Sequence, residues 1–227
     1  MKAISDRQLA AIKAGLFLLC LAPLARLGWG VWQDALGANP IEAIQRGLGS
    51  WALNLLVITL CLTPLRRLSG WPWLIRLRRM LGLYTFFYAA LHFLSYLWLD
   101  QFFDWDEIAR DIVKRPFITV GFAAFALLVP LAATSNRLAL RRLGGRRWQA
   151  LHRAIYPIAI FGVIHYWWLV KRDVATPALY AVAVLLLLGL RALWREQERR
   201  AQLAGKYAPQ QPPRVRGKII PIVAHRK

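Results

Sequence analysis

Five uncharged stretches, each long enough to cross a lipid bilayer as a helix, constrain this chain more than any other feature. They run over 47–65, 81–99, 116–135, 154–170 and 174–190. A helix needs roughly 17–25 mostly apolar residues to span the hydrocarbon core. A sixth span, 9–32, is bracketed by Lys13 and Arg26, whose long side chains can reach the membrane surface. The pattern predicts an all-α integral membrane protein, a six-helix transmembrane bundle.

The first span also allows a second interpretation. Its uncharged centre, 14–25, is short and follows a basic segment, which is typical of a secretory signal peptide. No clear small-x-small cleavage site follows it, so the spanning interpretation is favoured.

Basic residues set the expected orientation. The net charge of +20 would suit a nucleic-acid partner, but here Lys and Arg separate long uncharged runs, so we expect a lipid bilayer as partner and no nucleic acid. With both termini in the cytoplasm, only seven of the 31 Lys and Arg lie in outer loops: Arg26, Arg46, Arg110, Lys114, Arg115, Lys171 and Arg172. This positive-inside bias predicts an N-in, C-in protein.

The connections predict one bundle followed by a tail. The cytoplasmic turns are 66–79 and 136–147, and a tight outer turn at 171–173 makes the last two spans antiparallel neighbours. Residues 1–194 form the predicted transmembrane domain, and 195–227 form a basic, proline-containing cytoplasmic tail suited to the anionic inner leaflet. His225 in this tail is expected to face solvent. The acidic outer loop, 100–111, is either an amphipathic segment or a docking face for a basic partner.

Three of the four histidines, His92, His152 and His165, fall inside predicted spans, where polar side chains are costly and usually functional. Helix geometry places His92 about 17 Å and His165 about 25 Å from the cytoplasmic ends of their helices, whereas His152 lies only about 6 Å in. The first two are therefore predicted to meet. His152 would serve a second, inner site or donate a hydrogen bond there.

Imidazole ligands without acidic or thiolate partners suit haem better than zinc or a di-iron centre, because haem iron needs only one or two axial groups from the protein. His152 and His165 are 13 residues apart, which corresponds to about 20 Å of helix rise. In a straight helix their side chains would point about 140° apart. A kink at Pro157 would be needed to turn both toward the same side of the helix. The residues alone leave the second haem open.

Further side chains are candidates for lining the cofactor. Tyr88 belongs to an aromatic stripe that recurs every four residues and contains His92. Arg78, Arg79 and Arg153 lie at the inner membrane boundary, where they could bind haem propionates or another anionic cofactor, or simply anchor the helices. Cys20 and Cys61 are expected to be small packing residues.

Two other function classes fit a helical membrane protein with intramembrane histidines. A transporter or proton channel would use them as a proton relay, but it would be expected to carry intramembrane carboxylates or broken helices in paired halves. A structural anchor would only hold a partner enzyme at the membrane. Bis-imidazole haem instead leaves no open iron position, which predicts an electron carrier that is not itself the catalytic reductase.

The segments RRMLGLYTFFYAALHFLSY (78–96) and SNRLALRRLGGRRWQALHRAIYPIAIFGVIHYWW (135–168) carry a family resemblance. They closely resemble the haem-binding membrane subunits of the bacterial periplasmic methionine sulfoxide reductase system, within the wider ferric-reductase-like transmembrane family. The resemblance is strong over 60–172. It rests on LGL before the first histidine, and on LHR with a second histidine 13 residues later.

The resemblance implies a b-type cytochrome of the bacterial inner membrane. Such a subunit takes electrons from the quinone pool and passes them to a periplasmic molybdopterin catalytic subunit that repairs oxidised proteins. It implies haem b, one or two groups, at His92, His152 and His165, and FMN is also associated with the family. A cytochrome serving another partner, of the ferric or flavin reductase type, remains the alternative.

The chain departs from the wider family in two respects. Ferric reductases and NADPH oxidases typically carry two histidines on the third helix, and a cytoplasmic flavin and NADPH domain. Here Arg78 and Arg79 stand where the second histidine would be expected, and no such domain follows. This argues against direct NADPH oxidation by this chain.

Overall fold

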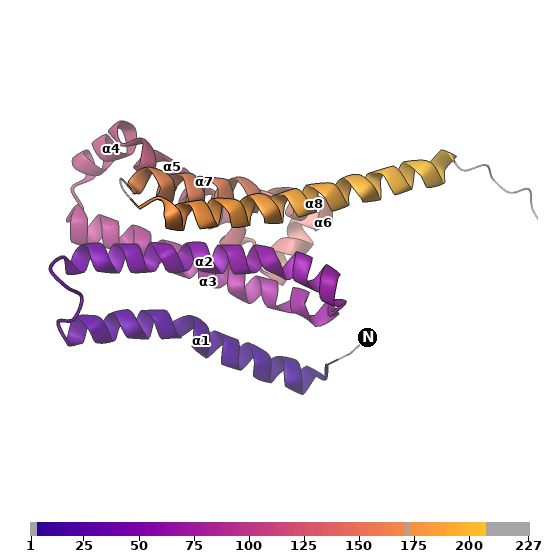
Figure 1. Cartoon of the computed structure of the whole chain (residues 1–227), viewed down its shortest axis with the longest axis horizontal. Coiled ribbons are helices and arrows are strands. Elements are labelled where there is room, and N and C mark those ends of the chain that lie inside the picture. Colours follow the sequence, from indigo (N-terminus) through magenta and orange to yellow (C-terminus); the bar gives the residue numbers. More distant parts are fainter. Residues whose placement is uncertain (1–3, 171–172, 208–227) are drawn as a thin grey trace, which may run out of the picture. The chain divides into compact units, whose positions relative to one another are not determined.

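The protein is helical throughout the part of the chain that the computed structural model describes, residues 4–170 and 173–207 (Figure 1). Most of the predicted outer turn at 171–173, the end of the tail and His225 lie outside the described residues. The elements in order are α1 (Asp6–Trp32), α2 (Pro40–Ser69), the 3₁₀ helix η1 (Pro72–Leu77), α3 (Arg78–Ser95), the π-helical turn η2 (Tyr96–Asp100), α4 (Trp105–Lys114), α5 (Pro116–Ala133), α6 (Arg137–His152), α7 (Ile155–Leu169) and α8 (Ala175–Tyr207).

Five helical segments are long and apolar enough to cross a membrane: α1, α2, the run from η1 through η2, α5 and α8. They account for five of the six predicted spans. The remaining one is shorter than expected, because α7 has only 15 residues. The count of six spans and the N-in, C-in orientation therefore stay predictions.

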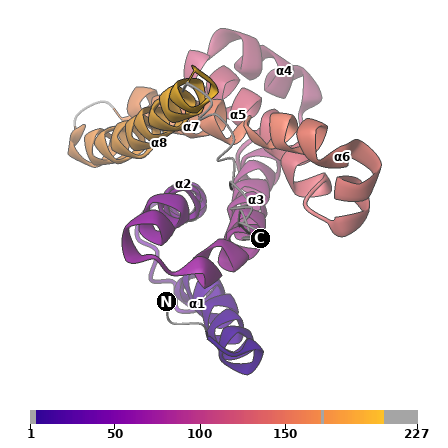
Figure 2. The same ribbon diagram turned by 90° about the vertical axis from the view of Figure 1, so that its right-hand side faces the viewer.

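Helix α2 is shared by two hydrophobic cores. Leu48, Leu55 and Leu62 recur every seven residues and pack with α1 and α3, whereas Leu53, Leu56 and Leu60 pack with α5, α7 and α8. Residues seven apart lie on nearly the same side of a helix, so the two sets form two separate faces. Figure 2 shows α2 and α3 side by side, with α1 on one side of them and α5 and α7 on the other.

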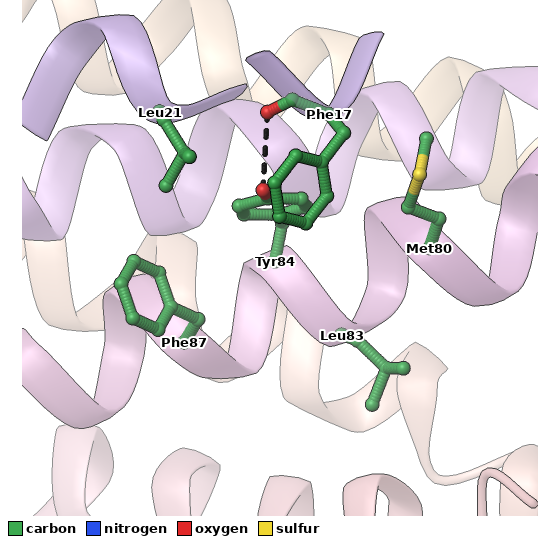
Figure 3. A pocket seen from close by; sticks show the side chains of 6 residues that line it. All are labelled: Phe17, Leu21, Met80, Leu83, Tyr84 and Phe87. Carbon is green, nitrogen blue, oxygen red and sulfur yellow. Dashed lines mark hydrogen bonds between the residues drawn. The ribbon is translucent and has the colours of Figure 1, made fainter. Parts of the chain in front are cut away.

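Two tyrosines of α3 attach α1. The Tyr84 hydroxyl donates to the Phe17 carbonyl at 3.0 Å, beside an apolar hollow of about 320 Å³ between the two helices (Figure 3). The fully buried Tyr88 donates to the Cys20 carbonyl at 2.6 Å and accepts from the Leu24 amide at 3.2 Å. Its hydroxyl thus stands between the donor and acceptor of one helical turn of α1. This turn contains Pro23, where a helix is expected to kink.

The segment before α7 differs from its prediction. The expected turn 136–147 is instead most of α6, which begins at the Asn136 cap and is kinked at Gly144, where φ is 74°. The chain then breaks between His152 and Ile155, so His152 ends α6 and does not belong to the fifth span. Pro157 is the third residue of α7, where it is tolerated because helix-starting amides have no intrahelical acceptor. The break, and not a kink at Pro157, separates His152 from His165.

The acidic outer loop contains α4, a ten-residue amphipathic helix capped by the Asp104 side chain. Its buried Asp111 accepts hydrogen bonds from Tyr96 and Gln101 and pairs with Arg115 at 3.0 Å. This segment is thereby tied to the end of α3. The expected amphipathic segment is present.

The chain divides into two compact units, residues 1–191 and 192–227. In the second unit, the described residues continue α8 as far as Tyr207. The boundary of the tail at 195 stays a prediction. Glu196 pairs there with Arg199 at 2.8 Å and with Arg200 at 2.9 Å, along one side of the helix.

Replacing Tyr88 with Phe tests the attachment of α1. The substitution keeps the ring but leaves the Cys20 carbonyl and the Leu24 amide without their shared partner, and a buried unsatisfied group costs about 1–3 kcal/mol. We expect a lower melting temperature in detergent. Tyr166→Phe is the control, because no hydrogen bond of its hydroxyl is found among the described residues. Equal melting temperatures of the two variants would contradict the role given to the Tyr88 hydroxyl.

Candidate functional site

The imidazole rings of His92 on α3 and His165 on α7 face each other. Their centres are 6.1 Å apart and their planes are inclined by 71°. The prediction that these two side chains meet is thereby confirmed. Both are half-buried in the interior between the helix pair α2–α3 and the helix pair α5–α7.

Each ring is held by a backbone carbonyl of the neighbouring helix. Nδ1 of His92 lies 3.0 Å from the Gln45 carbonyl oxygen of α2, and Nδ1 of His165 lies 2.7 Å from that of Phe117 on α5. A carbonyl oxygen can only accept, so Nδ1 carries the proton in both rings. In a neutral imidazole this leaves the lone pair on Nε2, the form in which histidine binds metals.

A glycine lies one helical turn beyond each of these carbonyls. A Cβ atom at Gly49 would come within 3.2 Å of Nδ1 and Cε1 of His92. At Gly121 it would come within 2.6 Å of Nδ1 of His165, closer than real Cβ atoms approach. Each ring thus has the same kind of seat, which consists of a backbone carbonyl and of the glycine four residues later in the same helix. It allows each ring to lie directly against a helix backbone.

The geometry fits a metal that brings most of its own ligands. A metal about 2 Å from one nitrogen of each ring places the ring centres about 6 Å apart, since each nitrogen lies about 1 Å from its ring centre. Among the residues that the structure describes, no three His, Cys, Asp or Glu side chains gather as a metal site. His92 and His165 could hold the iron of a porphyrin, which needs only one or two ligands from the protein.

Aromatic side chains of α3 and α5 pack on one another, and another lies beside His165. Phe93 of α3 lies against Phe125 of α5, with ring centres 4.8 Å apart, and Phe86 stacks on the same ring at 6.0 Å. The Phe117 ring is 6.3 Å from that of His165. Such side chains suit the apolar faces of a flat aromatic cofactor.

His152 occupies a separate position at the end of α6. Its ring stacks on Trp148 at 3.8 Å, and its Nδ1 lies 3.0 Å from the Trp148 carbonyl oxygen. Trp148 is fixed in turn by the Thr134 carbonyl at 2.9 Å, where α5 has ended. The His152 Nε2 atom is buried, and no described residue hydrogen-bonds to it. A metal or a donor group is the partner that this nitrogen could take.

The other predicted site residues lie apart from the histidine pair or serve other contacts. Arg79 and Arg153 are exposed. Arg78 donates to the Thr63 hydroxyl. The Tyr88 hydroxyl is engaged with α1 on both its donor and its acceptor side, and its role in lining a cofactor stays a prediction.

Sequence reasoning missed the groups that hold the rings. The carbonyls of Gln45 and Phe117 belong to the backbone, and their side chains carry no signal for the role. Gly49 and Gly121 are glycines within apolar spans, where close helix approach is the usual explanation. That each follows its carbonyl by four residues becomes informative only when the histidine opposite is known.

Comparison with known proteins agrees with this geometry. Residues 48–163 match the family described as ferric reductase like transmembrane component. The "Protein-methionine-sulfoxide reductase heme-binding subunit MsrQ" of Azospira oryzae is 61% identical over 86% of this chain and 82% of its own length. The chain belongs to the MsrQ family. The proteins of the same name from Herminiimonas arsenicoxydans and Xanthomonas campestris pv. campestris are 55% and 53% identical, over 86% and 88% of this chain and 90% and 93% of theirs.

Adding a methyl group at Gly121 tests the seat without reference to any cofactor. Gly121→Ala should displace the His165 ring and weaken its bond to the Phe117 carbonyl. The nitrogen resonances of His165, measured by NMR on protein labelled at histidine, should shift away from the hydrogen-bonded Nδ1 form. Gly189→Ala on α8 is the matched control, because a Cβ there meets nothing within 4 Å.

Gly49→Ala should shift His92 in the same sense but less, because its contact is 3.2 Å and not 2.6 Å. An unchanged His165 resonance in Gly121→Ala would show that this glycine has no role in seating the ring.

Proposed function

We propose that this chain is the haem-binding membrane subunit of a protein-methionine-sulfoxide reductase, and that it conducts electrons across the membrane. The observation that carries the proposal is the facing pair His92 and His165, with each Nδ1 on a carbonyl and the ring centres 6.1 Å apart. The names of its MsrQ relatives, which include heme binding, support the same cofactor.

The chain supplies position and rigidity. His92 and His165 would hold haem b, which would supply one-electron redox chemistry. The carbonyls of Gln45 and Phe117 would keep the proton of each ring on Nδ1 and so leave each Nε2 free to bind iron. Such outer partners of a ligating imidazole fix its orientation and its strength as a ligand. Gly49 and Gly121 let the rings lie close against the helices.

The electron partners are proposed from the family resemblance. The donor is the membrane quinone pool, and the acceptor is a periplasmic molybdopterin subunit that reduces methionine sulfoxide in oxidised proteins. The chain would lie in the bacterial inner membrane with both termini in the cytoplasm. FMN belongs to the same proposal, without an assigned site, and a ferric or flavin reductase partner is the alternative.

His152 is proposed to serve a second, inner haem. Its buried Nε2 atom has no partner among the described residues, while its Nδ1 is held by a carbonyl as in the other two histidines. A second imidazole facing it is not found there. Among the described residues, only the first proposed site has two facing imidazoles.

Removing each histidine in turn tests these assignments. His92→Ala and His165→Ala should each abolish the same low-spin haem, because a bis-imidazole iron needs both ligands. His152→Ala should keep that haem and lose at most a second one. The measurements are haem per protein from the pyridine haemochrome, and the low-spin signals in electron paramagnetic resonance.

His225→Ala, in the tail, is the control and should keep every haem. Loss of all haem in all three variants of the intramembrane histidines would contradict two separate sites. Colourless protein from haem-replete cells would instead favour the transporter or the structural anchor.

A further inference from the structure

Two guanidinium groups from different helices meet at one hydroxyl. Arg78 is the first residue of α3 and Arg191 lies on α8, and both donate through Nη2 to Oγ1 of Thr63 on α2. The bond from Arg191 is 3.3 Å long. Two like charges therefore share one small acceptor, an arrangement that mutual repulsion opposes unless a negative group lies beside them.

The position of Arg191 is fixed by a proline. Pro64 lacks an amide hydrogen, so the Leu60 carbonyl, four residues earlier in α2, has no helical donor. Arg191 supplies the missing donor through Nη2, at 2.5 Å. Its guanidinium carbon also lies 5.6 Å from the centre of the Tyr156 ring of α7. Three contacts thus hold this side chain at one place between α2, α7 and α8.

The charge of this arginine pair is not balanced within the described part of the chain. No ion pair with a carboxylate is found there for Arg78 or Arg191. Asp6, the one acidic residue on α1, pairs with Arg76 at 3.1 Å. The Nε atom of Arg191 is buried without a partner among the described residues. A buried charge that lacks an opposite charge is unfavourable, and most so inside a membrane.

We propose that Arg78 and Arg191 bind one oxyanion, a carboxylate or a phosphate, carried by an amphipathic molecule of the membrane. Guanidinium groups recognise these two anions through paired N–H donors, and Nε and Nη atoms still have donors to offer. The flanking helices are apolar, so the remainder of the ligand is apolar as well. The carboxylate of a porphyrin is one source, which rests on the proposed function, and the phosphate of an anionic phospholipid is the other, which does not.

The full chain in lipid nanodiscs tests the site. We compare wild type with Arg78→Gln, Arg191→Gln and the double variant. The control is Arg66→Gln, which removes an exposed arginine about one helical turn after Thr63 in α2. In one arm the discs contain phosphatidylcholine with phosphatidylglycerol, and native mass spectrometry measures which lipid stays bound. In the other arm, haem and haem dimethyl ester, which lacks free carboxylates, are titrated into haem-depleted protein.

Support is a preference for the anionic form in either arm. Wild type and Arg66→Gln should retain phosphatidylglycerol, or bind haem at least tenfold more tightly than its diester. Arg78→Gln and Arg191→Gln should each lose that preference. Thr63→Val keeps both charges without the shared hydroxyl and should retain most of the preference, even if an arginine variant fails to fold. Absence of both preferences in wild type, or their persistence in the double variant, would overturn the site.

The proposed function can fail separately from this site. If no haem binds to any variant, the haem proposal fails and the lipid arm alone decides the oxyanion site. If the haem that depends on His92 and His165 is present in every variant, loss of preference at Arg78 and Arg191 reports on the oxyanion site only.

Discussion

The facing imidazoles of His92 and His165 depend on two hydrogen bonds to backbone carbonyls, at Gln45 and Phe117. A helical carbonyl normally accepts from the amide four residues later, and its second lone pair is free for another donor. Using that lone pair fixes a ring against a helix without placing another side chain between them. The glycines one turn on are required by the same close approach. Helix spacing, ring tautomer and ring orientation are therefore determined together.

Other polar contacts in the spans also join a side chain of one helix to a polar group of a neighbouring helix. Within a bilayer no water satisfies a freed backbone group, so a side chain of a neighbouring helix can serve as the partner instead. Arg191 reaches the Leu60 carbonyl, which Pro64 leaves without a donor, and the Tyr88 hydroxyl of α3 bonds to Cys20 and Leu24, on either side of Pro23 in α1. Tyr180 similarly donates to the Asn54 amide oxygen at 2.8 Å, joining α8 to α2. Each of these contacts joins two helices.

The sequence allowed the spans and the histidine pair to be predicted because both follow from one-dimensional rules. Uncharged length predicts a span, and the rise of about 1.5 Å per residue sets the depth of His92 and His165. The segment around His152 was predicted less well. Residues 136–154 are polar, as expected of a turn, but their many Arg and Leu residues also favour the helix α6 that the structure contains. The carbonyls, the glycines and Arg191 could not be predicted, because their roles depend on which helices become neighbours. Arg191 in particular resembles an ordinary positive-inside anchor at the end of a span.

The two polar clusters of the interior differ in charge, which would matter for the proposed electron transfer. The imidazoles of His92 and His165 are each held by a backbone carbonyl, and the Phe117 ring lies beside His165. The arginine pair carries fixed positive charge, and positive charge near a redox centre stabilises the reduced form by ordinary electrostatics. An anion bound there would cancel much of that effect. An oxyanion bound at Arg78 and Arg191 would therefore lower the positive electrostatic potential at that end of the bundle.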